Sequence, residues 1–169
     1  MSQTSAAVPV ELKEALGLPD ASQIGLVVRD LDAAVAHFER VVGLGPFVRP
    51  EVHYDPVFYR GEPSPGSSWE MAFASLGPIE LELIMPVTRP TIYHDFLDAG
   101  GEGLHHVGFD LQDLDAKLAL CDRLGITVLQ AGRTPVGGFA YLDTGEVGGL
   151  MVEIIQRRGR RAPQVAKGS

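Results

Sequence analysis

The chain has 169 residues and a mass of 18.1 kDa, with 45% hydrophobic and 21% charged residues. These values predict one globular domain and exclude a disordered chain, a collagen and a disulfide-stapled miniprotein. No apolar run reaches the roughly 18 residues that span a bilayer, and the first residues lack the basic start and apolar stretch of a signal peptide. Since the single cysteine, Cys121, has no partner for an intramolecular disulfide, we expect a cytoplasmic protein.

The net charge of −8 is unevenly distributed along the chain. Five bases and no acid lie from Arg157 onward, which leaves 9 bases against 22 acids in the rest of the chain. A body this acidic is a poor partner for nucleic acid or for an anionic membrane surface. We therefore expect neither kind of partner, and we interpret residues 157–169 as a basic, flexible tail.

In chain order, residues 1–20 are predicted to be an N-terminal appendage that contains a short helix at Val10–Leu18. One domain is expected over residues 21–156, with module 1 at 21–88, a linker at 89–103 and module 2 at 104–156. Hydrophobic periodicity predicts helices at about Leu31–Val42, Pro90–Leu97 and Leu114–Leu124. A strand is expected at the start of each module, and further strands at about Phe47–His53, Glu70–Ser75, Ile79–Met85, Thr127–Ala131, Phe139–Asp143 and Leu150–Ile155.

An internal repeat relates the two modules. Residues 22–33 align with residues 105–116 at an offset of 83 without a gap, so that Gly25 matches Gly108 and the run Asp-Leu-Asp-Ala recurs intact. An aspartate stands at the expected N-cap of the helix in both copies. The sequence therefore predicts two β-α-β-β-β modules in a pseudo-twofold arrangement.

From Gln23 to Glu82 module 1 is longer by 12 residues than module 2 is from His106 to Glu153, and most of the difference lies within residues 54–68. This segment is rich in proline, and we interpret it as a candidate lid or specificity loop. Glu62 within it and Glu70 just after it are candidates for a second acid–base group. The sequence does not decide whether either side chain reaches a site.

Polar residues stand at matched positions in otherwise apolar strands. Gln23 and His106 open the first strand of each module, and Glu82 and Glu153 interrupt the last. A carboxylate among apolar neighbours is costly to bury unless it is neutralised. If the modules pack about a pseudo-twofold axis, the four positions converge, and such ligands suit Zn, Ni, Co, Mn or Fe(II).

Each of these residues also has a purely structural interpretation. Gln23 fits a polar strand end, the two glutamates fit solvent-facing edge charges, and His106 fits a core histidine. The repeat favours the metal site, because four polar residues at equivalent positions are hard to obtain by chance. The neighbouring His105 faces the other side of its strand and is expected to pack or to support the site rather than to be a ligand.

These features resemble the vicinal oxygen chelate superfamily, which includes glyoxalase I, methylmalonyl-CoA epimerase, extradiol dioxygenases and fosfomycin- and bleomycin-resistance proteins. The similarity lies in Gln23–Ala34, His105–Phe109 and Gly149–Ile155 and extends over about residues 20–156. It implies an α+β fold in which the two modules form a cup-shaped mixed sheet around one divalent metal ion. The family's four ligand positions fall on Gln23, Glu82, His106 and Glu153.

The linker Phe96–His106 is similar to that of methylmalonyl-CoA epimerases, although Gly66 stands where those enzymes have their first base. The expected function is a metal-dependent isomerase, epimerase or glyoxalase-like lyase that transfers a proton next to a carbonyl through a metal-bound enolate or enediolate. Glu153 is the expected base, with Glu82 as the second choice. The expected partners are a small carbonyl substrate, thioesters included, and a second copy of the chain in a homodimer.

A different class of function stays open on the same fold. Drug-resistance proteins of the superfamily bind a flat aromatic molecule in the cup and need no metal. Six aromatic residues are candidates to line such a pocket, namely Phe47, Phe58, Tyr59, Trp69, Phe73 and Tyr93. A small-molecule binding protein for a drug or aromatic ligand is therefore the alternative prediction.

Overall fold

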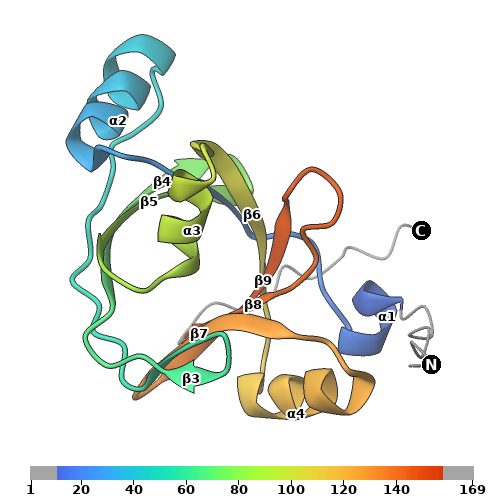
Figure 1. Ribbon diagram of the computed structural model, residues 1–169. Coiled ribbons are helices and arrows are strands. Elements are labelled where there is room, and N and C mark those ends of the chain that lie inside the picture. Colours follow the sequence, from blue (N-terminus) through green and yellow to red (C-terminus); the bar gives the residue numbers. More distant parts are fainter. Residues whose placement is uncertain (1–10, 158–169) are drawn as a thin grey trace, which may run out of the picture.

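The computed structural model describes residues 11–157 (Figure 1). The helices are α1 (Leu12–Leu16), α2 (Leu31–His37), the π-helical turn η1 (Phe38–Val42), α3 (Ile92–Asp98) and α4 (Leu114–Leu124). The strands are β1 (Gln23–Val27), β2 (Val57–Tyr59), β3 (Glu62–Pro63), β4 (Ser68–Leu76), β5 (Ile79–Thr88), β6 (Gly103–Asp110), β7 (Val128–Thr134), β8 (Gly137–Leu142) and β9 (Met151–Gln156). No helix in the described range has the length and apolar character needed to cross a membrane.

All strands belong to one mixed sheet in the order β3-β2-β7-β8-β9-β6-β1-β5-β4. Strands β1 and β6 pair antiparallel at its centre, while β1 runs parallel to β5 and β6 runs parallel to β9. Outward from this pair, β5 and β4 of module 1 therefore correspond to β9 and β8 of module 2, and β7 with the module 1 strands β2 and β3 extends the module 2 side. This arrangement confirms the predicted α+β fold and the pseudo-twofold relation of the modules.

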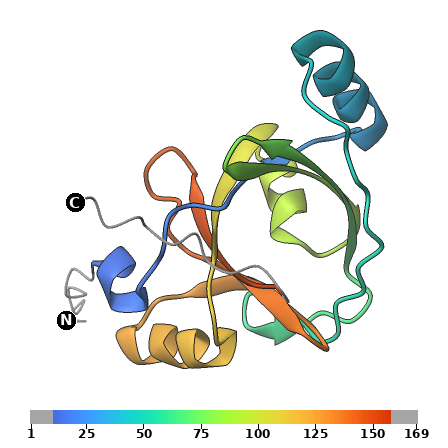
Figure 2. The ribbon, with the colours of Figure 1, turned by 180° about the vertical axis from the view of Figure 1, so that it is seen from behind.

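The sheet curls so that its concave face surrounds α3, as the two opposite views show (Figures 1 and 2). Ile92 and Tyr93 of α3 pack there against residues from both modules, among them Met71 and Tyr141. Helix α2 packs in a cluster with β4 and β5, and α4 packs against β8 and β9. Helix α3 therefore covers only one part of the concave face.

The structure contains the N-cap residues that the sequence predicts for α2 and α4. The Asp30 carboxylate accepts a hydrogen bond from the Ala33 amide at 2.9 Å, and the Asp113 carboxylate accepts one from the Ala116 amide at 3.1 Å. Both predicted N-caps are thus confirmed. The first of these helices changes from α to π geometry at Phe38 and ends, as predicted, at Val42.

The two ends of the described range are joined to the body. Leu16 of α1 and Leu18 just after it are buried in the same cluster as α4. At the other end, Arg157 pairs with Asp110 and Glu80 at 2.7 and 2.6 Å. Arg157 therefore belongs with the folded domain, whereas the rest of the predicted basic tail lies outside the described residues.

Two predictions for module 1 are wrong. Residues 47–53 do not form a strand, because Pro46 and Pro50 lack the N–H groups that a regular ladder needs. Only an isolated bridge forms there, between Val48 and Phe73. Residues 54–68 are not a free lid, because β2 and β3 within them form a hairpin whose first strand pairs with β7.

Residues 48–55, which overlap both of these segments, connect β4 of module 1 with β7 of module 2. The Val48 backbone makes two hydrogen bonds of 2.8 Å with Phe73 of β4, and the Asp55 amide donates to the Arg133 carbonyl of β7 at 2.8 Å. We call residues 48–55 the strap. Since β4 and β7 belong to different modules, the strap spans the open side of the curled sheet.

Candidate metal centre and cup

The predicted polar residues meet at the central strand pair. In the β1–β6 ladder Gln23 stands opposite Gly108, and Gly25 stands opposite His106. A Cβ at Gly25 would overlap the imidazole of His106, and a Cβ at Gly108 would lie 3.0 Å from Gln23 Oε1. The two matched glycines of the repeat therefore leave room for the two polar side chains.

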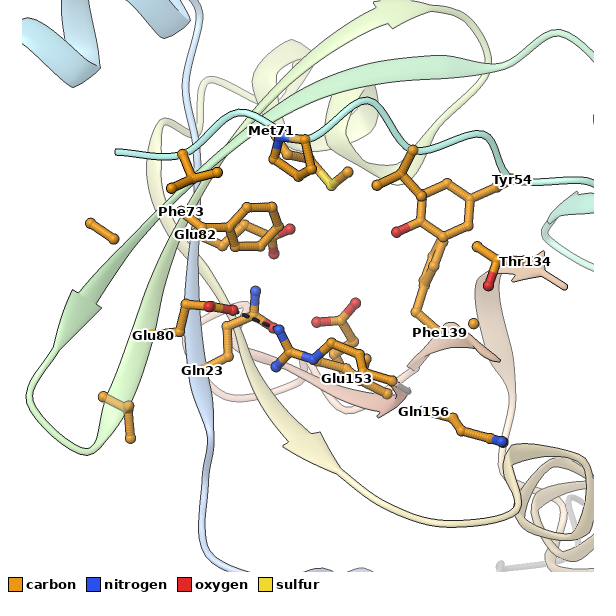
Figure 3. A pocket seen from close by; sticks show the side chains of 18 of the residues that line it. Gln23, Tyr54, Met71, Phe73, Glu80, Glu82, Thr134, Phe139, Glu153 and Gln156 are labelled. Atoms are coloured by element: carbon orange, nitrogen blue, oxygen red, sulfur yellow. Dashed lines mark hydrogen bonds and ion pairs between the residues drawn. The ribbon is translucent and has the colours of Figure 1, made fainter. Parts of the chain in front are cut away.

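Three of the side chains form a compact buried cluster. Ligand atoms of Glu82, His106 and Glu153 all lie within 4.8 Å of one another, and each residue is at most 5% exposed. His106 Nε2 lies 3.2 Å from Glu82 Oε2 and 3.2 Å from Glu153 Oε2. Gln23, 2% exposed, lines one cavity with Glu82 and Glu153 (Figure 3), and His106 contacts both glutamates, so the structure brings all four predicted residues to one place.

The hydrogen bonding of this cluster is incomplete. One N–H at His106 Nε2 donates to Glu82, and Glu153 Oε2 is left with no hydrogen bond although it is buried. The buried Gln23 Oε1 also lacks a donor. Buried acceptors without partners are rare and unfavourable, so this cluster has room for a cation that accepts several oxygen ligands.

His105 supports His106 from the other side of the strand. The two Nδ1 atoms lie 3.1 Å apart, and the His105 ring is enclosed by Tyr93, Phe96 and Tyr141. Burial and the neighbouring His106 lower the pKa of His105 to about 3, so His105 stays neutral. A neutral His105 can accept the Nδ1 proton of His106 and leave Nε2 as the free ligand atom.

The cluster is electrostatically stressed in the absence of a metal. Burial raises the pKa of Glu82 to about 7, against the hydrogen bond from His106, which lowers it. Burial alone would lower the pKa of His106, but the carboxylates of Glu153 and Glu82 raise it to about 9. Without a metal, the histidine therefore holds a proton between two carboxylates that compete for it.

A cavity of about 820 Å³ opens above this cluster. Gln23, Glu82 and Glu153 lie at its floor, and Figure 3 shows their side chains directed into it. Its walls are largely apolar and come from the strap, from β4 and from β7–β9, and they include Val48, Val52, Met71, Phe73, Val136, Phe139 and Ile155. The cup thus combines a polar floor with apolar sides.

The other candidate site residues lie elsewhere. Glu62 and Glu70 are exposed, and neither lines the cup, so neither is placed to act as a second base there. Of the six aromatic candidates only Phe73 lines the cavity, whereas Tyr93 is core and Trp69 packs behind the strap.

Sequence reasoning missed two aromatic residues of the cup, Tyr54 and Phe139. The repeat held no signal for Tyr54, because it lies in the strap that only module 1 has. Phe139 opens a predicted strand, but its inward direction depends on how the sheet curls.

The fold and the four convergent residues define a cup-shaped protein of paired β-α-β-β-β modules. Residues 22–142 match the model of the glyoxalase/bleomycin resistance protein/dioxygenase superfamily, and the chain belongs to this superfamily. The predicted family resemblance is confirmed.

A curated relative, the uncharacterized protein YqjC of Bacillus subtilis (strain 168), is 30% identical over 139 residues, which cover 80% of this chain and 91% of the relative. The fold is also similar to a methylmalonyl-CoA epimerase of Streptomyces coelicolor in complex with 2-nitronate-propionyl-CoA, with 23% identity, a TM-score of 0.65, and coverage of 86% of this chain and 99% of that one. A hypothetical protein, BH1468 of Bacillus halodurans C-125, aligns with 15% identity and a TM-score of 0.63 over 84% of this chain and 96% of that one.

Proposed function

We propose that the protein is a metal-dependent enzyme that transfers a proton next to a carbonyl, as an isomerase, an epimerase or a glyoxalase-like lyase. The observation that carries the proposal is the buried cluster in which a single imidazole N–H faces two carboxylates while Gln23 Oε1 and Glu153 Oε2 have no hydrogen bond. A divalent cation relieves this stress, because it replaces the shared proton and accepts all four ligands.

In this proposal Gln23, Glu82, His106 and Glu153 hold one divalent ion such as Zn, Ni, Co, Mn or Fe(II). When bound, the ion polarises the substrate carbonyl as a Lewis acid and makes the adjacent C–H more acidic. The apolar walls of the cup exclude water from the reacting atoms.

Glu153 is the proposed base. Its Oε2 faces the cavity and completes no hydrogen bond although it lies 3.2 Å from His106 Nε2, whereas Glu82 Oε2 is hydrogen-bonded to the same nitrogen. A carboxylate that is less tightly held can take up the substrate's α-proton and return it with little movement. Glu82 then serves mainly as a ligand.

The proposed substrate is a small carbonyl compound. Structural neighbours include a methylmalonyl-CoA epimerase in complex with methylmalonyl-CoA, which keeps thioesters among the candidates. The proposed assembly is a homodimer, as the resemblance implies.

Exchange of the α-hydrogen with D₂O tests the proposal on the chain loaded with one metal ion. We expect wild-type protein to exchange at least one compound of a panel of hydroxyketones, 2-oxoaldehyde hemithioacetals and 2-methyl thioesters. Glu153→Gln keeps the shape and an oxygen ligand, and should slow the exchange by roughly 10²–10⁴-fold. The matched control is Glu70→Gln, since Glu70 is exposed and outside the cup.

Two results would reject this function. The first is a wild-type chain that binds no divalent ion after dialysis against each metal. The second is an exchange rate that Glu153→Gln leaves unchanged while Glu82→Gln does not lower metal content.

The volume of the cup favours a second candidate, a binding protein for an aromatic molecule. About 820 Å³ lined by Tyr54, Phe73 and Phe139 suits a drug-sized ligand. Tight aromatic binding that survives full removal of metal, with no exchange on any compound, would favour this candidate over the enzyme.

A further inference from the structure

Tyr54 is held rigidly on the strap. The next residue, Asp55, is anchored by its amide to Arg133 of β7. The Tyr54 ring stacks on Trp69 with a centroid distance of 5.3 Å, and it meets the edge of Phe139 at 4.9 Å. A Cβ at Gly132 would lie 3.2 Å from the Tyr54 ring, so this glycine leaves room for it. These contacts define the direction of the phenol.

The Tyr54 hydroxyl points into the cup, toward the cavity that Glu82 and Glu153 also face (Figure 3). Within residues 11–157 it makes no hydrogen bond. The other tyrosine hydroxyls all do: Tyr59 bonds Asp95 at 2.9 Å, and Tyr93 bonds Tyr141 at 3.1 Å. Tyr54 is half-buried and its hydroxyl faces the cavity, so the hydrogen-bond partner of this O–H is expected to be a molecule in the cup.

The surroundings of Tyr54 make it a donor rather than an acceptor. Burial, together with the negative charges of Glu82 and Glu153, raises the pKa of Tyr54 well above its ordinary range. The phenol therefore keeps its proton at neutral pH. An O–H in an apolar wall above two carboxylates is matched by an oxygen that carries negative charge.

We propose that Tyr54 donates a hydrogen bond to the substrate oxygen on which negative charge develops, from the strap side of the cup. This role rests on the proposed function. The proton stays on the phenol, and the hydrogen bond strengthens as charge moves from the α-carbon to the oxygen. The strap thereby contributes chemistry as well as one wall of the cavity.

Binding of an anionic oxygen chelator tests this role without turnover. Benzohydroxamate is titrated into Co²⁺-loaded protein, and its binding is followed in the visible spectrum of the cobalt. Tyr54→Phe keeps both ring contacts and should weaken benzohydroxamate binding by about 10- to 100-fold, the range for a hydrogen bond to a charged group. Affinity for Co²⁺ should stay the same. The matched control is Tyr59→Phe, which removes a hydroxyl that is bonded to Asp95 outside the cup.

The possible outcomes separate the two proposals. Equal benzohydroxamate affinity in wild-type and Tyr54→Phe protein would overturn the role of Tyr54 and leave the metal site standing. A wild-type chain that holds no Co²⁺ would reject the proposed function, and the role of Tyr54 with it.

A second measurement uses the wild-type sequence at Tyr54, so that it does not depend on whether Tyr54→Phe folds. Wild-type protein labelled with 3-fluorotyrosine has four ¹⁹F sites, which Tyr59→Phe, Tyr93→Phe and Tyr141→Phe assign by elimination. Benzohydroxamate should shift the Tyr54 resonance most. A Tyr54 resonance that stays in place at saturating benzohydroxamate contradicts the proposal.

Discussion

Replacing Gly25 by alanine should strongly weaken metal binding although none of the proposed ligands is substituted. The added Cβ would overlap three ring atoms of His106, which is fully buried. Non-bonded carbons need about 3.5 Å, so the imidazole must move by on the order of 1.5 Å. Metal–ligand distances tolerate only about 0.2 Å, and we therefore expect divalent metal affinity to fall by at least about 100-fold.

The same substitution should lower stability, although alanine normally suits a strand better than glycine does. Overpacking a well-filled site costs about 1–3 kcal/mol, which corresponds to a fall of roughly 3–10 °C in the melting temperature of metal-free protein. Isothermal titration with Zn²⁺ and thermal melts in EDTA measure the two effects. The control is Gly145→Ala in the turn after β8, where a Cβ comes no closer than 3.4 Å to any neighbour.

The variant Gly108→Ala should have a steric effect between those of Gly25→Ala and Gly145→Ala. At Gly108 the Cβ would meet the ends of flexible side chains, 2.9 Å from Ile155 Cδ1 and 3.0 Å from Gln23 Oε1. Gly108→Ala should therefore weaken metal binding less than Gly25→Ala. If Gly25→Ala binds one ion with wild-type affinity, then His106 is not held as a ligand against β1, and the reasoning fails.

Three further predictions concern the cluster, a buried ion pair and assembly. Without metal, the free energy of unfolding should fall as pH rises from about 6.5 to 9, because the raised pKa values of His106 and Glu82 mean that the folded chain binds more protons than the unfolded chain in that window, whereas below it the lowered pKa of His105 opposes the effect of Glu82; urea melts in EDTA at pH 6.5 and 8.5 measure this, and higher stability at pH 8.5 would contradict it. Arg157→Met should destabilise the protein by about 1–3 kcal/mol because it removes a cation shared by the buried Asp110 and the half-buried Glu80, whereas Arg89→Met, at an exposed pair, should cost less than about 1 kcal/mol; equal losses in urea melts would refute the distinction. Sedimentation should detect a homodimer at micromolar concentration, and a lone 18.1 kDa species would remove that proposal.

The repeat predicted that the four polar residues would converge, because both halves follow the same local rules. An offset of 83 relates Gln23 to His106 and Gly25 to Gly108, and antiparallel pairing of the two copies places each glycine opposite the polar residue of the other. Those relations need only strand alternation and a pseudo-twofold axis. The convergence of Glu82 and Glu153 follows from the parallel pairing of β5 and β9 with the central strands.

The strap could not be predicted in the same way, because only its bridge at Val48 has a counterpart in module 2, where β7 pairs with β8. Its path depends on two distant attachments, Val48 to Phe73 and Asp55 to Arg133, and no local pattern encodes either. Residues 47–53 read as a strand from their apolar content, but two prolines limit the pairing to one bridge. Tyr54, which depends on this path for its direction, was therefore missed.

The charge balance of the site argues for a particular division of roles. On the proposed ligand set, two carboxylates offset a divalent ion, while Gln23 and the neutral form of His106 add no charge. A neutral carbonyl compound can then enter without electrostatic repulsion. The negative charge that develops on its oxygen is not balanced by any charge of the proposed ligand set. The strap places the donor Tyr54 on the side of the cavity opposite the polar floor, among apolar walls where a hydrogen bond to charge is strongest. In this proposal the two modules supply the ligands and the base, and the segment that breaks their symmetry supplies the donor.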